Sequence, residues 1–369
     1  MRRRRSEARI SRPPLRWAIA AVVVVVAAVA IINAVVALPL GQGLAAAPAR
    51  VSNVAFGAYV GPTAKGVRAL PAWQQFAGTK ATYALDYAAA DSWVNVEGPD
   101  WALSPWWGAG RRLIYSVPLF PHLPTDRAAG AGKALARCAA GDFDPQWAQL
   151  GHNLVSHRLA TAIIRPGWEF DADWYVWAAH GRKQDYIDCF RHLVSAMRSA
   201  DRQRFQFLWN PTVGMHQFPA EQAYPGDDYV DYVGVDVYDT SWAPGTYPYP
   251  TKAKTAKRAA IQASVWKTLL SGERGLAFWA AWASAHGKRM AVPEWGLSER
   301  VDGHGGGDDV TFVRGMLDFI SDPRNDVAFA MYFDVDTDTG IGDHHRISTS
   351  DTRFPRAAAV FRQLMADRS

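Results

Sequence analysis

The sequence predicts an α/β protein whose main domain is a (β/α)8 barrel, and three observations support this prediction. Short apolar runs recur along residues 53–369, and turn residues follow each of them. Helical patterns separate several of these runs, which is typical of parallel βαβ units. The runs are continuously apolar, as expected for strands that are covered on both faces. The eight runs lie at 54–60, 81–87, 112–120, 160–166, 205–211, 232–238, 289–295 and 327–333.

The segments between the runs favour a closed barrel over an open sheet. Helical patterns at 143–157, 184–200 and 312–322 precede the fourth, fifth and eighth runs. Eight such units over about 315 residues fit the usual size of a (β/α)8 barrel. A doubly wound open sheet is the alternative. Its support is weaker, because residues 57–66 after the first run read GAYVGPTAKG and do not match the dinucleotide-binding pattern GxGxxG.

The N-terminal region predicts a membrane anchor. Residues 1–16 carry seven arginines and one glutamate, a charge of +6, and residues 17–40 are apolar apart from Asn33. This run reaches the roughly 20 residues that a membrane span needs. We therefore expect a basic cytoplasmic tail at 1–16, a transmembrane helix at 17–40 and a linker at 41–52. A long signal peptide cut near 44–49 is the alternative, and with either one the positive-inside rule exports the remainder.

The body of the chain lacks the charge of a nucleic-acid-binding protein. The net charge is +5, so residues 17–369 together carry −1, and no nucleic acid partner is expected. The sequence has two cysteines, Cys138 and Cys189. In an exported protein they could form a disulfide, and two unpaired buried thiols are the alternative. Without suitably spaced histidines, two cysteines do not predict a zinc site.

Two glutamates stand where chemistry is expected, because the active site of such a barrel lies at the C-terminal ends of its strands. Glu169 follows the fourth run and Glu294 ends the seventh. A facing pair of carboxyl groups can hydrolyse a glycosidic bond. One protonates the departing oxygen, and the other attacks the anomeric carbon or activates a water. Apolar surroundings would raise the pKa of the acid. Tryptophans able to stack on sugar rings lie at or just past the strand ends: Trp168, Trp174, Trp177, Trp209, Trp242 and Trp295.

Four stretches resemble motifs of glycoside hydrolase family 26, whose best-known members are β-mannanases. IIRPGWEFDADWYVW at 163–177 resembles the acid/base motif, in which Arg165 precedes Glu169 and a W-Y-x-W pattern follows. VDYVGVDVYD at 230–239 resembles the sixth-strand motif and gives Asp236 and Tyr238. MAVPEWG at 290–296 resembles the nucleophile strand. FLWNPT at 207–212 resembles the fifth-strand end, where Trp209 would line the site.

The resemblance implies a retaining β-glycosidase that uses neither a metal nor an organic cofactor. Glu169 would be the acid/base and Glu294 the nucleophile, oriented by Arg165 and Tyr238. The substrate of the family is by default a β-mannan, and β-glucan or a cell-surface polysaccharide made by the cell itself are alternatives. We expect an endo-acting monomer, held at the cell membrane by a single span with its catalytic domain outside the cytoplasm.

Three departures from the family pattern leave the sugar open. Trp168 stands where mannanases typically have histidine, Asp171 and Ala172 replace an Asn-Gly pair, and residues 332–333 read Tyr-Phe where the family often has tryptophan. Trp168 and Asp171 are therefore predicted to contact the substrate and to decide its identity. A non-catalytic carbohydrate-binding protein of the cell surface is the alternative function, although binding alone would not require the two glutamates.

Overall fold

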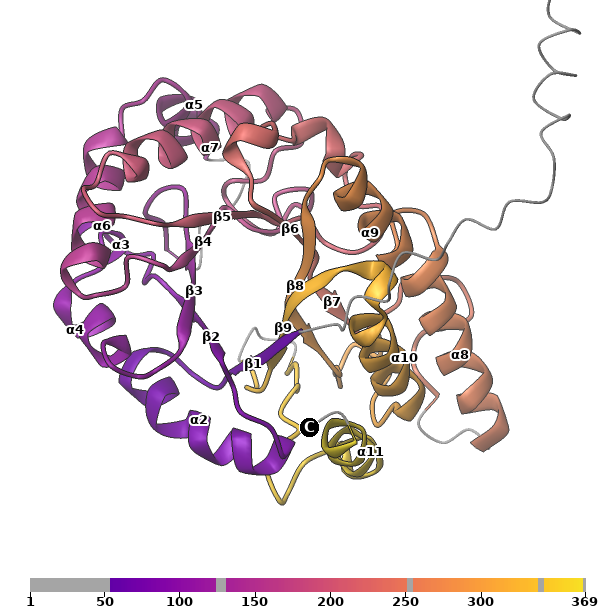
Figure 1. Ribbon diagram of the computed structural model, residues 1–369. Coiled ribbons are helices and arrows are strands. Elements are labelled where there is room, and N and C mark those ends of the chain that lie inside the picture. The colour runs from indigo at the N-terminus through magenta and orange to yellow at the C-terminus, as the bar shows by residue number, and fades with distance from the viewer. Residues whose placement is uncertain (1–53, 124–130, 251–254, 338–341, 368–369) are drawn as a thin grey trace, which may run out of the picture. The chain divides into compact units, whose positions relative to one another are not determined.

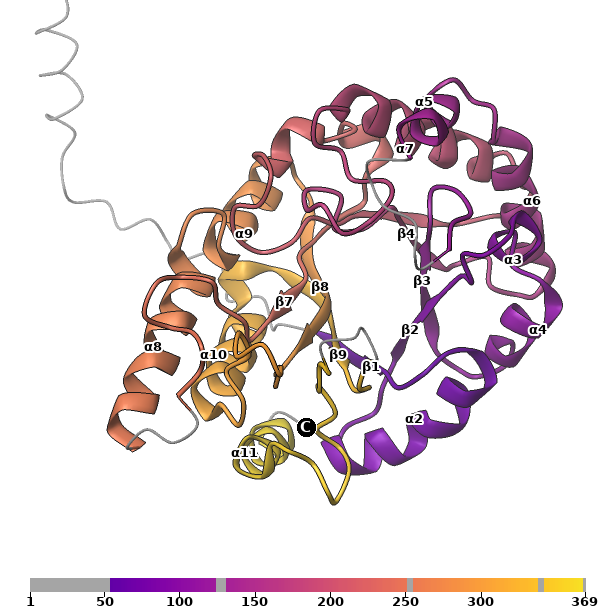
Figure 2. The ribbon, with the colours of Figure 1, turned by 180° about the vertical axis from the view of Figure 1, so that it is seen from behind.

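A closed ring of parallel strands surrounded by helices forms the body of the protein (Figure 1; Figure 2 gives the view from behind). The structure is a computed structural model that describes residues 54–123, 131–250, 255–337 and 342–367. Neighbouring strands follow the order β6-β5-β4-β3-β2-β1-β9-β8, and the pairing of β6 with β8 closes the ring. The predicted (β/α)8 barrel is confirmed.

Each of the eight predicted runs contains a strand of the barrel, and the sixth run contains two. Residues 235–236 interrupt this sixth segment, so β6 pairs with the start of β8 and β7 pairs with its end. The strands are β1 (Ala55–Tyr59), β2 (Tyr83–Tyr87), β3 (Arg112–Val117), β4 (Ile163–Pro166), β5 (Gln206–Trp209), β6 (Tyr232–Gly234), β7 (Val237–Tyr238), β8 (Arg289–Gly296) and β9 (Val327–Phe333).

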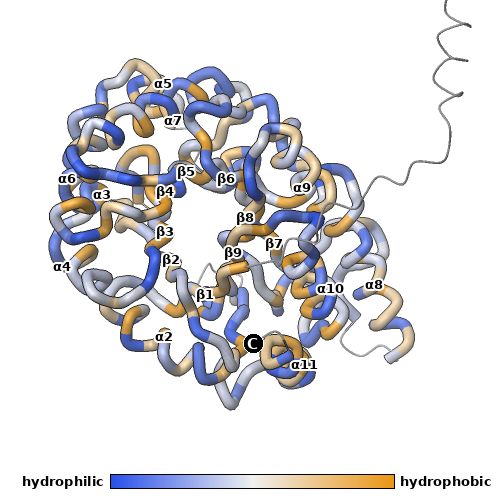
Figure 3. The backbone as a smooth tube through the Cα atoms, in the orientation of Figure 1, coloured by the Kyte–Doolittle hydropathy of each residue, from blue (hydrophilic) through white to orange (hydrophobic). Residues whose placement is uncertain are grey.

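The helices pack around the outside of this ring and alternate between hydrophilic and hydrophobic residues along their length (Figure 3). In α10 the buried residues recur at helical spacing, from Phe312 to Ile320, and the Asp309 side chain caps the first turn by accepting from Thr311 N and Phe312 N. The helices are α2 (Thr63–Ala77), α3 (Trp93–Val96), α4 (Asp100–Leu103), α5 (Gly132–Ala139), α6 (Asp144–Ser156), α7 (Lys183–Arg198), α8 (Thr255–Ser271), α9 (Leu276–Ala285), α10 (Val310–Ser321) and α11 (Pro355–Ala366).

The basic tail at 1–16, the transmembrane helix at 17–40 and the linker at 41–52 lie outside the described residues. Within the described ranges, from residue 54 to residue 367, no helix has the length and apolarity that a bilayer crossing requires.

A cluster of buried apolar side chains from the strands fills the interior of the barrel and is here called the barrel plug. These side chains pack against one another, so the barrel has a packed core and not a pore. A second and larger core lies between the strands and the surrounding helices. The barrel plug consists of Leu85, Ile114, Ile163, Leu208, Tyr232, Ala291, Ala328, Phe329 and Met331.

A disulfide joins two helices of the outer ring. Cys138 in α5 and Cys189 in α7 are bonded, with their Cα atoms 4.9 Å apart and a sequence separation of 51. Of the two alternatives that the sequence left open, the structure therefore contains the bonded pair. The ring closed by this bond encloses α6, β4 and the loop that carries Glu169.

Candidate active site

The candidate active site lies one layer above the barrel plug. Side chains of a strand alternate between its two faces, so the residue two positions beyond an inward-facing one faces inward again. Two positions beyond Leu85, Ile114, Ile163 and Leu208 stand Tyr87, Ser116, Arg165 and Asn210. All four take part in one hydrogen-bond network at the C-terminal ends of the strands.

Arg165 is the centre of this network. Its guanidinium is fully buried and donates to Asn210 Oδ1 at 2.8 Å, to Ser116 Oγ at 3.0 Å and to Glu294 Oε1 at 2.5 Å. It also forms an ion pair with Asp236. The planar fork of an arginine suits this task, because it can bind two carboxylates in fixed directions. Arg165 therefore fixes the two acidic groups relative to one another.

Glu294 is positioned by an irregularity in β8. It lies three residues beyond Ala291 of the barrel plug, an odd interval that would point it outward in a regular strand. The pairing of β8 with β9 shifts register between Met290 and Val292 and again between Val292 and Trp295, and such a bulge re-aims side chains. The Glu294 carboxylate is 6% exposed. It accepts from Arg165, from Tyr87 Oη, and from Tyr238 Oη at 2.8 Å.

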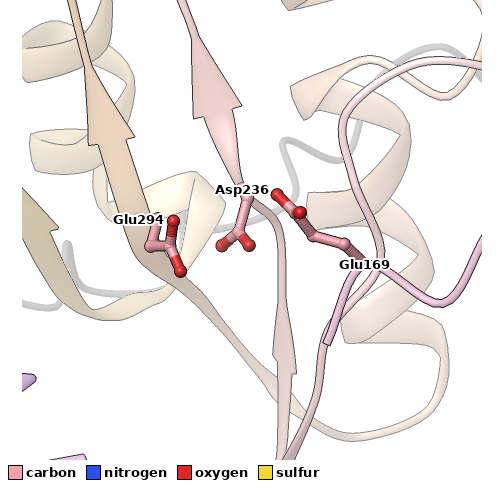
Figure 4. A group of neighbouring side chains, drawn as sticks. All are labelled: Glu169, Asp236 and Glu294. Carbon is pink, nitrogen blue, oxygen red and sulfur yellow. The ribbon is translucent and has the colours of Figure 1, made fainter. Parts of the chain in front are cut away.

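Glu169 reaches the site from the loop after β4. Its backbone has a φ of +53°, and its amide donates to Asn210 O at 2.8 Å, which ties this loop to the end of β5. One carboxylate oxygen from each of Glu169, Asp236 and Glu294 lies within 4.8 Å of the others. Figure 4 shows the three side chains converging from the loop, from the break between β6 and β7, and from β8. The two predicted catalytic glutamates therefore face one another.

Burial and negative charge give Glu169 an unusual pKa. Desolvation, with the repulsion of Glu294, raises the pKa of Glu169 to about 7, although Arg165 and a hydrogen bond from Trp174 act in the opposite direction. Trp174 Nε1 donates to Glu169 Oε2 at 2.7 Å. A carboxyl group with such a pKa can hold a proton near neutral pH and release it to a leaving group, as a general acid must.

The rate of catalysis is expected to fall as the pH rises through about 7, because the pKa of Glu169 lies there and the general acid must be protonated. Replacing Trp174 with phenylalanine removes a donor that stabilises the charged carboxylate, so the pKa rises and the falling limb of kcat/KM moves to higher pH. The control is Trp101→Phe on α4, an exposed tryptophan that leaves the profile unchanged. A falling limb that stays in place in Trp174→Phe would contradict this assignment.

Asp236 lies between the two glutamates and is buried. Burial raises its pKa, Arg165 lowers it, and Glu294 and Glu169 raise it again; the net direction is well above the ordinary value. Asp236 and Glu294 both pair with Arg165, so a cationic side chain already occupies the centre of this acidic cluster. The arrangement fits a positioning role for Asp236, which holds Arg165 against Glu294.

Trp168 and Trp174 have environments that allow contact with a ligand. Trp168 lines the cavity beside Glu294, lies 5.2 Å from the Arg165 guanidinium, and donates through Nε1 to Tyr175 Oη at 2.9 Å. Trp174 is 49% exposed. Trp242 is exposed on the loop after β7, where its ring stacks on His304 at 4.7 Å. These three tryptophans can present a ring to a sugar.

Three further tryptophans predicted to bind substrate are core residues. Trp177, Trp209 and Trp295 are at most 1% exposed, so a direct contact with a sugar is not open to them. Trp177 supports the acid/base loop from beneath, since its Nε1 donates to Trp168 O at 2.8 Å and its ring lies 4.8 Å from that of Trp168. These three tryptophans lie at the predicted strand ends, but their rings are buried in the core and do not face the cavity.

Asp171 also points away from the cavity. Its carboxylate is 1% exposed and accepts from Thr212 N at 3.0 Å and from Thr212 Oγ1 at 2.8 Å. This pair of bonds joins the loop after β4 to the loop after β5. The predicted contact between Asp171 and the substrate is therefore replaced by a structural role.

Replacement of Asp171 with alanine is expected to lower the free energy of unfolding by about 1–3 kcal/mol, because two buried Thr212 donors lose their acceptor. The KM for the substrate should change little. Chemical denaturation and steady-state kinetics measure the two effects. Asp173→Ala, an exposed change in the same loop, serves as the control. Unchanged stability together with a raised KM would show that Asp171 contacts the sugar after all.

Sequence reasoning missed three members of the network: Tyr87, Ser116 and Asn210. Tyr87 donates to the Glu294 carboxylate, and Asn210 accepts from Arg165. A signal for them exists in the sequence. Each stands two positions beyond an apolar residue that fills the barrel plug, so counting in steps of two along each run would have found them.

A cavity of about 520 Å³ opens beside Glu294, within the usual range for sites that hold small organic ligands. It extends from the end of β4 to the loops that follow β1 and β9. Its lining residues are Tyr59, Val60, Gly61, Pro62, Lys65, Tyr87, Trp168, Tyr175, Glu294, Phe333, Val335, Asp336, Thr337 and Arg346.

Comparison with known proteins is consistent with this site. The model of the family described as glycosyl hydrolase family 26 matches residues 141–265, which include Arg165, Glu169 and Asp236 and end before β8. Endoglucanase H of Acetivibrio thermocellus is 33% identical over 84 residues. That alignment covers 21% of this chain and only 9% of the relative.

Solved structures of similar fold extend the comparison to most of the chain. A modular endo-β-1,4-mannanase from Cellulomonas fimi has a TM-score of 0.57 at 18% identity, over 85% of this chain and 70% of the mannanase. GH26C from Muricauda sp. has a TM-score of 0.55 at 15% identity, with 86% of both chains covered. The YdhT protein from Bacillus subtilis has a TM-score of 0.53 at 15% identity, over 85% and 86% of the two chains. At these identities the likeness concerns the fold.

The barrel and the family match over residues 141–265 are both features that this chain shares with glycoside hydrolases. Within this class, the predicted resemblance to family 26 is confirmed by the match over residues 141–265.

Proposed function

We propose that this protein is a retaining glycoside hydrolase that cleaves a β-linked polysaccharide within the chain. One observation carries the proposal: carboxylate oxygens of Glu169 and Glu294 lie within 4.8 Å of one another. Retaining enzymes hold their two carboxyl groups about 5–5.5 Å apart, whereas inverting enzymes need about 6.5–9.5 Å to accommodate a water molecule. The short separation of these oxygens supports the retaining spacing and favours direct attack by one carboxylate.

In the first step Glu294 attacks the anomeric carbon while Glu169 donates its proton to the glycosidic oxygen. The bond to the leaving sugar breaks, and an ester forms between Glu294 and the remaining sugar. Tyr87, Tyr238 and Arg165 each donate to the Glu294 carboxylate, which holds it in one orientation and stabilises its negative charge. Because its pKa is raised to about 7, the Glu169 carboxyl group can carry the proton that it donates.

In the second step Glu169 changes from a general acid to a general base. Having lost its proton, Glu169 takes one from a water molecule, which attacks the anomeric carbon and releases Glu294. Once Glu294 is esterified, it no longer repels the Glu169 carboxylate. One of the causes that raise the pKa of Glu169 is then removed, which favours its action as a base.

A β-mannan is the first candidate substrate, and two comparisons bear on it. The barrel resembles that of an endo-β-1,4-mannanase, while the relative with the higher sequence identity is named an endoglucanase, so a β-glucan is the second candidate. Of the two departures from the family pattern beside Glu169, Asp171 is buried and Trp168 lines the cavity. Trp168 is therefore the position at which the choice of sugar is expected to be made.

The stereochemistry of the first product tests the mechanism. Defined oligosaccharides of β-mannan, β-glucan and β-xylan are incubated with the purified domain, and proton NMR follows the anomeric signal before mutarotation. We expect a β-anomer to appear first. An α-anomer would overturn the retaining mechanism. Binding of an oligosaccharide with no cleavage over long incubation would instead identify a carbohydrate-binding protein.

We further propose that the catalytic domain acts outside the cytoplasm as a monomer, tethered by the segment at 17–40. The arginines before this segment and its apolar length support the proposal, and the disulfide between Cys138 and Cys189 fits an oxidising compartment. Fractionation of cells that express the full chain, followed by protease treatment of intact cells, tests it. Recovery of the intact domain from the culture medium would show cleavage, and recovery from the cytosol would overturn export.

A further inference from the structure

The cavity beside Glu294 has two basic side chains among its lining residues, Lys65 and Arg346, here called the basic end. A neutral sugar needs no such charges. Within the described parts of the chain, neither side chain makes a hydrogen bond or an ion pair with another residue. Arg346 is half-buried, and an arginine in that position usually has a carboxylate partner. The basic end therefore has the capacity to bind an anion that the protein itself does not supply.

The backbone of Arg346 is held in place by acidic residues that follow β9. Asp336 Oδ1 accepts from Arg346 N at 3.2 Å and from His345 N at 3.1 Å, and Asp334 Oδ1 accepts from Ile347 N at 2.7 Å. The His345 ring packs against Tyr238, 4.8 Å away, which links this segment to the nucleophile's own partner. Arg346 thus starts from a fixed backbone, and little ordering is required when it binds a ligand.

Lys65 lies in the first turn of α2, where it is exposed and lines the cavity. The turn is anchored to the barrel, because Thr63 N donates to Asp86 Oδ2 at 2.9 Å. The methylenes of Lys65 extend along Gly61, where an added Cβ would lie 3.4 Å from the lysine side chain. This contact directs the stem of Lys65 across the loop after β1.

A continuous aromatic wall connects the basic end with Glu294. Tyr87 donates to Glu294, the Tyr59 ring lies 4.9 Å from that of Tyr87, and the Phe333 ring stacks on Tyr59 at 5.1 Å. Tyr59, Tyr87 and Phe333 all line the cavity that contains Lys65 and Arg346. A sugar chain bound along this wall, with one residue at Glu294, would bring a further residue to the basic end.

Asp336 lines the same cavity as the basic end. Among the residues that the structure describes, it and Glu294 are the two acidic residues that line this cavity. Its Oδ1 is used by the two backbone amides, and its Oδ2 lies 3.6 Å from His344 Nδ1. Arg346 attracts Asp334 and Asp336 electrostatically, but among the described residues its guanidinium forms no direct ion pair with either of them, so it can still bind the carboxylate of a ligand.

We propose that the basic end is a subsite for an anionic sugar residue, whose carboxylate is bound by Arg346 and Lys65 while the neighbouring residue is cleaved at Glu294. The inference rests on the proposed function and narrows its substrate class to acidic β-linked polysaccharides. A guanidinium can bind a carboxylate through two parallel hydrogen bonds, and the Lys65 ammonium, which lines the same cavity, adds a second charge. A sulfate ester carries the same negative charge on a different group, and the experiment separates the two.

Binding to an inactive variant tests the subsite. Glu294→Gln is titrated calorimetrically with a β-1,4-mannan hexasaccharide, with the corresponding mannuronate hexasaccharide, which differs in its carboxylates, and with a sulfated mannan hexasaccharide. We expect the mannuronate to bind at least about tenfold more tightly than the neutral chain at low salt, with a smaller ratio at high salt. Equal binding of the neutral and acidic chains, or no binding of the acidic one, would overturn the proposal. Tighter binding of the sulfated chain than of the mannuronate would overturn its carboxylate part.

Removal of each charge in the same background locates the effect. Arg346→Gln and Lys65→Gln should each weaken mannuronate binding by about three- to tenfold and leave binding of the neutral chain unchanged. Lys80→Gln, an exposed lysine outside the cavity, is the control. Melting temperatures equal to that of the parent exclude unfolding as the cause. A ratio of acidic to neutral affinity that persists in both variants would contradict the assignment.

Cleavage assays with the wild-type chain separate this inference from the function on which it rests. If the acidic chain binds preferentially and neither chain is cleaved, the subsite stands and the hydrolase proposal fails. If the neutral chain is cleaved with retention and the acidic chain is excluded, the hydrolase stands and the acidic subsite fails.

Discussion

Replacement of Glu294 by alanine is expected to lower kcat by about 10⁴- to 10⁶-fold, the range typical for removal of a nucleophile that forms a covalent intermediate. The side chain receives hydrogen bonds from Arg165, Tyr87 and Tyr238, and no other carboxylate in the described structure has this set of donors. With an activated aryl glycoside, azide should enter the space left by the carboxylate and restore part of the turnover. The product would be a glycosyl azide of inverted configuration.

Two further variants separate chemistry from structure in this experiment. Glu294→Gln keeps the volume of the side chain and should be nearly as inactive, while Glu299→Ala removes a carboxylate on the following loop, where Glu299 pairs with Arg353, and should retain activity. Turnover of Glu294→Ala near the wild-type rate, on any substrate that the wild type cleaves, would contradict the nucleophile assignment.

Replacement of Arg165 by methionine is expected to have the largest effect on stability, a loss of about 3–5 kcal/mol in the free energy of unfolding. The guanidinium is fully buried, so its removal leaves Asp236 and Glu294 without their ion-pair partner and takes the donor from Ser116 Oγ and Asn210 Oδ1. The variant should also be inactive, because Glu294 loses its orientation. Urea denaturation and a kinetic assay measure the two losses.

Arg353→Met provides the control for Arg165, since Arg353 forms an exposed ion pair with Glu299 that should contribute no more than about 1 kcal/mol. Combining Arg165→Met with Asp236→Asn should recover part of the lost stability, because the neutral amide no longer leaves a buried negative charge unpaired. If the double variant is less stable than Arg165→Met, charge is not the cause of the loss.

The barrel could be predicted from the sequence because its signal is repetitive. Each of the eight runs is mostly apolar and does not alternate with polar residues, and this property arises directly from burial of a strand on both faces. The interruption of the sixth strand at residues 235–236 could not be predicted, because Val235 continues the apolar pattern and the break depends on how β8 pairs with its two neighbours. Pairing of this kind is a tertiary property.

The charged residues of the candidate site could be predicted from the sequence, whereas the residues that surround them could be predicted only in part. Glu169, Glu294, Arg165 and Asp236 were named from the sequence, and the structure brings them together. The geometry at Glu294 was beyond sequence reasoning, because an odd step along β8 requires a bulge to turn the side chain inward.

The tryptophans show a second limit of the sequence. Trp174 and Trp177 lie three residues apart in one aromatic motif, yet Trp174 is exposed and bonded to Glu169 while Trp177 is fully buried. Both are tryptophans of the loop after β4, so composition cannot distinguish a ring that faces the ligand from one that is buried beneath the loop. The irregular path of the loop decides between the two.

The positive φ of Glu169 places stability and activity in opposition at a single residue. Side chains other than glycine and asparagine rarely adopt this backbone conformation, which costs a typical residue about 1–2 kcal/mol. Mutation of this codon toward glycine would therefore strengthen the fold and end the reaction in the same event. A descendant with glycine at this position would keep a stable barrel and its sugar-binding cavity but would no longer hydrolyse the sugar. Selection of variants for thermal stability alone would therefore favour loss of catalytic activity at this residue.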